Sequence, residues 1–353
     1  MTDPHLATVH RHTSSSRIAI GCGLLLVLAV PSMPFWASSG HIRWAVELGC
    51  FIAIAQMWNL LAGYGGMVSV GQQAFIGLGG YALFALVTLL GVDPFLAVPL
   101  SVILPTLVAA PAYLLLRRLD GPYFAIGTWV LAEVLRLVTS NIGAVNAGSG
   151  MTLKAMAKYS AHQREIGLTL LVAMLLLLTV GGTYLLLRSR LGLALTAMRD
   201  DAVAASSQGV DVGRMRFSVY LLAAVGTGLA GAIYFMAQLR ISPISGFDPN
   251  WSSICIFIVM VGGIGRLEGP IIGALLYFFA TRLFGQYGSA YLVVLGLLTL
   301  VVAIRAPTGL WGLIQRVRQW PWFPTDYILV RGQEINALAQ NIRDDTTQEA
   351  RSS

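Results

Sequence analysis

Long runs of apolar residues, separated by short polar segments, follow one another along most of the chain. The runs are continuously apolar and do not alternate with polar residues, which favours membrane-spanning helices over the strands of a β-barrel. Because a membrane-spanning helix needs about 20 predominantly apolar residues, the pattern predicts ten spans. They lie at 18–37, 44–62, 67–90, 95–116, 122–141, 166–187, 215–238, 251–264, 269–285 and 288–305. The predicted fold class is therefore all-α, a polytopic transmembrane helical bundle.

The eighth and ninth runs are short and lie on either side of a glycine-rich turn that ends at Pro270. They fit either two thin spans or one broken, re-entrant pair of the kind that transporters place within the membrane. We therefore expect about 8–10 spans with broken or re-entrant segments.

The positions of the basic residues indicate how the chain lies across the membrane, because cytoplasmic loops carry an excess of arginine and lysine. With the N-terminus in the cytoplasm, the cytoplasmic segments hold 16 of the 23 basic residues and the outer segments hold five. We therefore expect both termini in the cytoplasm. The expected organisation is a tail at 1–17, a transmembrane domain at 18–305 with a cytoplasmic loop at 188–216, and a second tail at 306–353.

The composition excludes several classes of protein. Of the residues, 56% are hydrophobic and 11% charged, and the mean hydropathy is +0.72, which rules out an ordinary soluble enzyme or a nucleic-acid-binding protein. The two lysines, Lys154 and Lys158, do not lie in a phosphate-binding loop, so any ATP must be bound by another subunit. No nucleophile–base set and no metal-ligand spacing is found, and we therefore predict no catalytic residue and no metal site.

Polar side chains at membrane depth form the first candidate site. The stretch 59–81 contains seven glycines together with Ser69, Gln72 and Gln73, and it ends at Tyr81. Amides that face lipid are costly, so these side chains should face another helix or a water-filled cavity. The glycines fit either close helix packing or an unwound segment around a substrate. We therefore predict that these four polar residues line a substrate pathway.

Glu133 and Arg136 form a second candidate. They are three residues apart in a predicted helix, so they lie on one face and can form an ion pair. The pair is expected to be structural, with direct substrate contact or a proton relay as the alternatives, and both residues are retained as pathway candidates.

The cytoplasmic loop at 188–216 forms the third candidate. Apolar residues recur there at helical spacing, and Gly209 follows as a helix stop. The apolar positions are Leu191, Leu195, Met198, Ala202 and Ala205. A short amphipathic helix of this kind lies on a membrane surface or docks into a groove of a partner, and small residues favour the groove.

Five segments resemble the membrane permeases of branched-chain amino acid ABC importers, and together they extend over about residues 40–315. They are 59–81, 121–126, 188–216, 262–270 and 306–310. The resemblance implies a permease of the bacterial inner (plasma) membrane that is not itself an enzyme and holds no cofactor. It also implies a second homologous permease subunit, cytoplasmic ATP-binding subunits that hold ATP and Mg²⁺, a periplasmic or extracellular substrate-binding protein, and contact with lipid but not with nucleic acid.

The resemblance further implies an alternating-access mechanism driven through a coupling helix of pattern E-A-A-x3-G. Ala204, Ala205 and Gly209 match its last three fixed positions, and Val203 replaces the acidic one. Acidic residues lie just before it. The expected coupling residues are therefore Arg199, Asp200, Asp201, Ala204, Ala205 and Gly209.

The sequence leaves two alternatives open. The expected cargo is leucine, isoleucine or valine, but the same family carries urea, short-chain amides or aromatic acids. Outside the family, a proton-coupled secondary transporter needs an unpaired carboxylate at membrane depth. Glu133 is the candidate for that role, and Arg136 lies within reach of it.

Overall fold

The computed structural model describes residues 8–10, 21, 23, 25, 27–287, 290–306, 308–317 and 328–330. The chain divides into two units, one made of 1–22 with 320–353 and the other of 23–319. In the first unit, strands β1 (Thr8–His10) and β4 (Ile328–Val330) pair antiparallel, with Thr8 opposite Val330. The predicted tails fall largely outside the described residues. Of the 20 residues of the predicted span at 18–37, 14 are described, and these are helical as far as Phe35.

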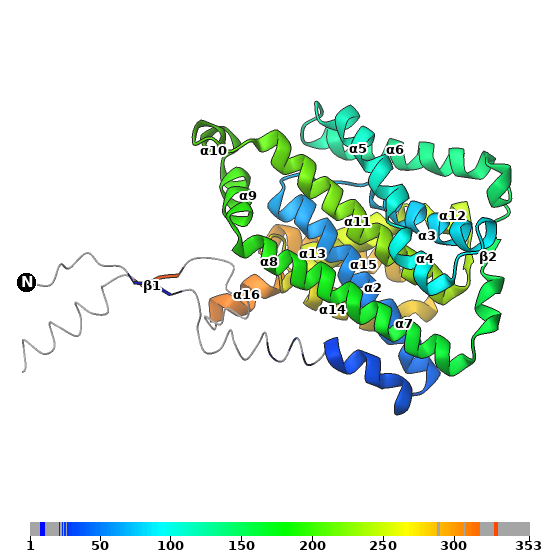
Figure 1. Cartoon of the computed structure of the whole chain (residues 1–353). Helices are drawn as coiled ribbons and strands as arrows, with labels where there is room; N and C mark the ends of the chain where they lie inside the picture. Colours follow the sequence, from blue (N-terminus) through cyan, green and yellow to red (C-terminus); the bar gives the residue numbers. More distant parts are fainter. Residues whose placement is uncertain are drawn as a thin grey trace, which may run out of the picture. The chain divides into compact units, whose positions relative to one another are not determined.

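The second unit is almost entirely helical (Figure 1). Its first half contains η1 (Val30–Phe35), α2 (Ser39–Asn59), η2 (Leu60–Tyr64), α3 (Gln72–Leu89), α4 (Pro94–Leu100), α5 (Ile103–Leu116), α6 (Pro122–Asn141), η3 (Gly143–Val145), β2 (Met151–Thr152) and η4 (Lys154–Lys158). Its second half contains α7 (Ala161–Leu176), η5 (Leu177–Gly181), α8 (Gly182–Arg188), α9 (Arg190–Asp200), α10 (Ala202–Ser207), α11 (Val212–Gln238), β3 (Arg240–Ile241), α12 (Pro243–Gly246), α13 (Asn250–Gly262), α14 (Gly269–Phe284), η6 (Gly285–Tyr287), α15 (Ala290–Arg305) and α16 (Gly309–Val317).

Eight helices of the described part are long and apolar enough to cross a membrane, which confirms the all-helical bundle. The two short runs form α13 and α14, which pack against each other as a hairpin around a turn at 263–268. α12 lengthens the apolar segment of α13 to Pro243–Gly262. α14 has 16 residues and is therefore about 24 Å long, less than the roughly 30 Å of a bilayer core.

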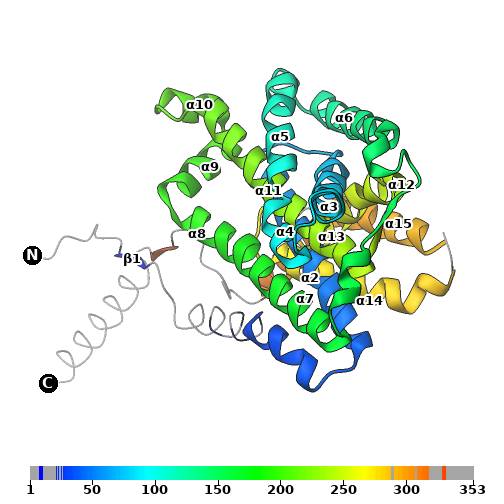
Figure 2. The same cartoon turned by 45° about the vertical axis from the view of Figure 1, so that its right-hand side comes forward.

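Three helices form the centre of the bundle. Within their apolar windows 83% of α2, 78% of α3 and 72% of α11 is buried, against 22% of α6, which lies at the edge in both views (Figure 2). α11 packs against α2 and α3. A Cβ atom added to Gly79 of α3 would lie 2.0 Å from the carbonyl oxygen of Gly228 in α11, so only glycine permits this approach. Close packing, one of the two roles expected of these glycines, is thus confirmed here.

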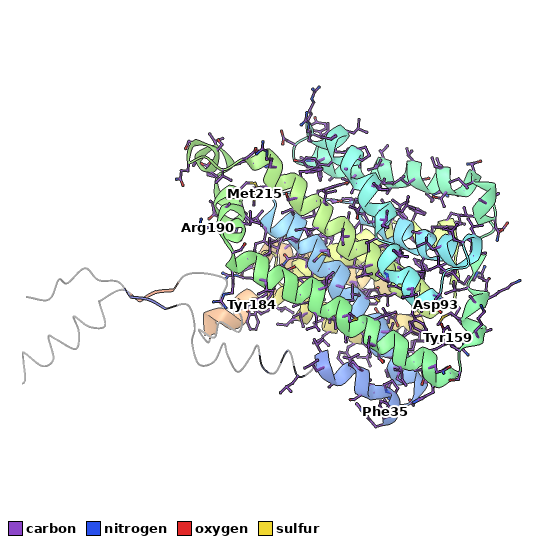
Figure 3. The ribbon with its side chains drawn as sticks, viewed as in Figure 1. Phe35, Asp93, Tyr159, Tyr184, Arg190 and Met215 are labelled. Atoms are coloured by element: carbon purple, nitrogen blue, oxygen red, sulfur yellow. The ribbon has the colours of Figure 1, made fainter. Side chains whose placement is uncertain are left out.

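Different segments connect the helices at the two ends of the bundle. Asp93 and Tyr159 lie side by side at one end, and Arg190 and Met215 lie at the other (Figure 3). The Asp93 carboxylate caps α4 by accepting from the amide of Phe95 at 2.9 Å, and it also accepts from the hydroxyl of Tyr159. That hydrogen bond holds the pKa of Asp93 below its usual value. Strands β2 and β3 pair antiparallel at the same end.

The loop at 188–216 differs from the prediction of one amphipathic helix. It forms two helices, α9 and α10, that are separated at Asp201, whose carboxylate accepts hydrogen bonds from the amides of Val203 and Ala204. This is an N-cap, so a new helix begins here. Gly209 ends the second helix with φ +88°, as expected. Three predicted apolar positions, Leu195, Met198 and Ala205, are buried within this chain, and Leu191 is exposed. The apolar face is therefore largely covered by the chain itself.

Candidate functional site

An unwound segment at residues 65–71 interrupts the membrane-spanning part of the chain between η2 and α3. The sequence predicted a span from residue 67, but the helix begins only at Gln72. Gly66 has φ +67°, a conformation that favours glycine. η2 is a short π-helix, a feature frequent at functional sites. The glycines of the stretch 59–81 thus serve both an unwound segment and close packing.

Side-chain groups form hydrogen bonds with the backbone of this partly buried segment. The amide of Val70 donates to the hydroxyl of Thr128 at 3.1 Å, and the amide of Gly71 donates to the hydroxyl of Ser69 at 3.2 Å. The indole of Trp58 donates to the carbonyl of Ser69 at 2.7 Å. Because unpaired backbone groups are costly in a bilayer, these bonds allow the helix to start at membrane depth.

Gln72 and Gln73 lie at the start of α3 and are fully buried. The Gln72 amide nitrogen Nε2 donates to the hydroxyl of Thr227 on α11 at 2.6 Å, and its backbone amide donates to the hydroxyl of Ser252 on α13 at 3.1 Å. The Ser252 hydroxyl in turn donates to Gln73 Oε1. The two glutamines therefore join α3 to both neighbouring helices and face protein, as the cost of exposing amides to lipid predicted.

Two buried side-chain atoms of α3 have no partner among the described residues: Gln72 Oε1 and the hydroxyl of Tyr81. Tyr81 is buried, and its ring stacks on Phe247 with the centroids 6.1 Å apart. The described contacts thus leave one acceptor unused at the start of α3, beside the unwound segment, and one hydroxyl unused nine residues farther along the helix.

The Glu133–Arg136 ion pair is confirmed. Arg136 donates to both carboxylate oxygens of Glu133, from Nε at 2.9 Å and from Nη2 at 2.5 Å. The pair lies apart from the buried stripe of α6, which includes Thr128 and Ala132. Its side chains remain partly exposed, so the structure does not bring them together with Gln72 and Gln73.

A cleft of about 370 Å³ opens beside the unwound segment. It is lined by Gly66, Met67, Val68, Tyr113, Arg117, Leu119, Asp120, Gly121, Pro122, Phe124, Ala125 and Arg216. Arg216 forms a 3.9 Å ion pair with Asp120. In the sequence, Arg117 and Arg216 count only among the basic residues of the segments expected in the cytoplasm, because nothing in their spacing indicates that α5 and α11 bring them to one cleft.

The loop residues contact the turn between α13 and α14. Arg199 pairs with Asp200 at 3.2 Å, and an added Cβ on Gly265 would lie 3.1 Å from Arg199 Nη1. Asn59, at the end of α2, accepts from the amide of Gly265 at 2.8 Å and donates to the carbonyl of Arg266 at 2.9 Å. A continuous set of contacts thus joins α9 to the helix that enters the unwound segment.

The exposed side of α10 is formed by other residues. Val203 is 79% exposed and Ala204 is also exposed, whereas Ala205 is 3% exposed. Of the residues that match the coupling pattern, Ala204 and Gly209 are therefore open to a partner, and Ala205 packs within this chain.

Comparisons with known proteins agree on one family. Residues 41–303 match the model of the branched-chain amino acid transport system permease component. The high-affinity branched-chain amino acid transport system permease protein LivM of Escherichia coli K12 is 27% identical over 81% of this chain and 73% of its own length. The probable branched-chain amino acid transport permease protein LivH of Methanocaldococcus jannaschii is 25% identical over 70% and 84%. The fructose import permease protein FrcC of Rhizobium meliloti is 27% identical over 53% and 55%. No solved structure matches the chain.

Proposed function

Because the chain belongs to the branched-chain amino acid permease family of ABC transporters, we propose that it imports leucine, isoleucine and valine as the permease subunit of an ATP-driven importer. The family match over residues 41–303 is the observation that carries this proposal. The chain is a multi-pass inner-membrane protein, and we place both termini in the cytoplasm. Because a fructose permease is also a relative, the cargo needs a direct test.

The unwound segment is the proposed centre of the substrate pathway. Ser69, Gln72 and Gln73 lie on or beside it, and Tyr81 lies nine residues farther along α3. The unused Gln72 Oε1 can accept a hydrogen bond from a polar cargo, and the unused Tyr81 hydroxyl can donate one. Transporters place substrates beside unwound helices near the membrane midplane. The cleft beside Gly66 is the proposed inner opening, where Arg117 and Arg216 can meet the carboxylate of a departing amino acid.

We propose that the ATPase subunit contacts this chain at α10 and transmits the effect of ATP hydrolysis there. Val203 and Ala204 are exposed there, and they are the residues that a cytoplasmic ATPase subunit would contact. Motion of α9 would then reach the unwound segment through Gly265 and Asn59. ATP and Mg²⁺ are bound by the ATPase subunits. A binding protein delivers the cargo from outside, and a second permease completes the pathway.

Uptake in a strain that lacks this permease tests the cargo. Labelled leucine, fructose, urea and benzoate are offered in turn to cells that carry the wild-type gene. We expect restoration of leucine uptake only when an ATPase subunit is present. Uptake of another compound in place of leucine contradicts the cargo, and full uptake without any ATPase favours a proton-coupled transporter.

A single substitution on α10 tests the coupling surface. Val203→Arg should reduce the copurifying ATPase by about tenfold, because a new charge at the centre of a contact is left without a partner. Ile244→Arg is the matched control: Ile244 is 73% exposed and lies in α12, at the other end of the bundle. It should leave ATPase recovery unchanged. Equal recovery from the two variants argues against α10 as the contact.

A further inference from the structure

α6 has an outward face that carries charge. Glu133 lies more than two helical turns from either end of this 20-residue helix. At 1.5 Å per residue, such a helix is about as long as the hydrocarbon core of a bilayer is thick. The ion pair with Arg136 therefore lies at membrane depth, with 44% of the Glu133 side chain and 28% of the Arg136 side chain exposed.

An exposed ion pair at this depth is unfavourable against lipid, and it is tolerated where protein surrounds it. The guanidinium group has five N–H donors. Two of its nitrogens, Nε and Nη2, donate to Glu133, which leaves donors for acceptors on a neighbouring molecule. Interhelical hydrogen bonds of this kind hold membrane helices together. The charge pattern thus favours a protein neighbour over lipid.

Two other outward faces of the described spans differ from that of α6. α15 exposes only apolar side chains along its described middle, among them Val294, Leu298 and Val301. The Glu47–Arg282 ion pair is also partly exposed, but Arg282 lies in the last turn of α14. Its guanidinium group lies 5.1 Å from the ring centroid of Trp44, an arrangement typical of the membrane–water interface. These two faces are therefore compatible with contact to lipid.

We propose that the outward face of α6, formed by Val130, Glu133, Val134, Arg136 and Leu137, is the surface on which the second permease subunit docks. This inference rests on the proposed function, which supplies that subunit. Val130, Val134 and Leu137 are each about half exposed, and they flank the ion pair at helical spacing. The facing helix of the second permease carries polar acceptors opposite Arg136 and apolar residues around them.

Photocrosslinking in membranes tests this surface in the assembled importer. A photoreactive phenylalanine derivative replaces Val130 or Val134 of α6, and Val294 or Leu298 of α15 in the matched controls. We expect adducts with the second permease from α6 and only lipid adducts from α15. Two results overturn the proposal while the second permease copurifies: α6 positions that react with lipid alone, or with a second copy of this chain. If no second permease copurifies, the proposed function fails first, and this assignment fails with it.

Charge variants give an independent measurement. Arg136→Gln should lower the second permease recovered per molecule of this chain by about tenfold, because Glu133 then meets the partner uncompensated. The double variant Glu133→Gln with Arg136→Gln is neutral and should recover more of the partner than the single variant. Equal recovery from wild type and both variants shows that the pair does not face the second permease.

Discussion

At the scale of single residues, the contacts of the candidate site residues divide into those that the sequence predicts and those that it does not. The Glu133–Arg136 pair follows from a spacing of three residues on a helix, and the structure confirms it. The bonds of Gln72 to Thr227 and of Gln73 to Ser252 join residues more than 150 positions apart. Only the cost of exposing an amide predicted that such partners exist, and it did not identify them.

Thr227→Val tests how far the Gln72 side chain depends on its partner. The valine removes the acceptor of Gln72 Nε2 and leaves a buried donor unpaired, which should cost about 1–3 kcal/mol of unfolding free energy. Thermal unfolding of the purified protein in detergent measures the loss. Thr169→Val is the control, because the buried Thr169 hydroxyl bonds only carbonyls of its own helix in the described structure. Equal shifts for both variants contradict a special role for Thr227.

At the scale of elements, continuous apolar runs predicted the helices closely. The helix at 122–141 was predicted with the bounds that α6 has, and α14 and α15 differ from prediction by only one or two residues. The points at which a helix begins late or is divided were less predictable from the sequence. α3 starts five residues late because side chains of other helices satisfy the backbone before it. The loop helix divides because the Asp201 carboxylate accepts from two amides that follow it.

Gly79→Ala tests the packing of α3 against α11. The added methyl group would lie 2.0 Å from the carbonyl oxygen of Gly228, so the helices must separate. The cost should be about 1–3 kcal/mol or more, as for other overpacked cores. Gly182→Ala serves as the control, since Gly182 is helical and has no atom within 4 Å of the added Cβ. It should be neutral or stabilising by about 0.5–1 kcal/mol. A midpoint temperature that is unchanged in Gly79→Ala contradicts the close approach.

At the scale of the whole molecule, the structure separates two ends of the bundle. Gly265 brings the loop residue Arg199 to the turn between α13 and α14, and Gly263 of that turn contacts Thr308. The loop and the start of α16 therefore lie at one end. Gly150 contacts Ile241 at the end that carries β2 and β3. From the distribution of the basic residues we expect the first end to face the cytoplasm.

Epitope tags test the orientation. A tag after Ser353 should be accessible to antibody only in inverted membrane vesicles, and a tag inserted after the exposed Ser149 only in right-side-out vesicles. The reason is the positive-inside rule, since 16 of the 23 basic residues lie in the segments assigned to the cytoplasm. Access to both tags from one side contradicts the orientation.

The fold class, the helix positions and the family resemblance follow from the sequence alone, because hydropathy and local spacing are properties of short segments. Only the tertiary structure decided which helices lie at the centre, how the chain passes from η2 to α3, and that Arg117 and Arg216 share a cleft. It also decided that the Glu133–Arg136 pair faces outward. These features depend on contacts between segments far apart in the chain. In an apolar helix, the local sequence does not indicate which face contacts protein and which contacts lipid.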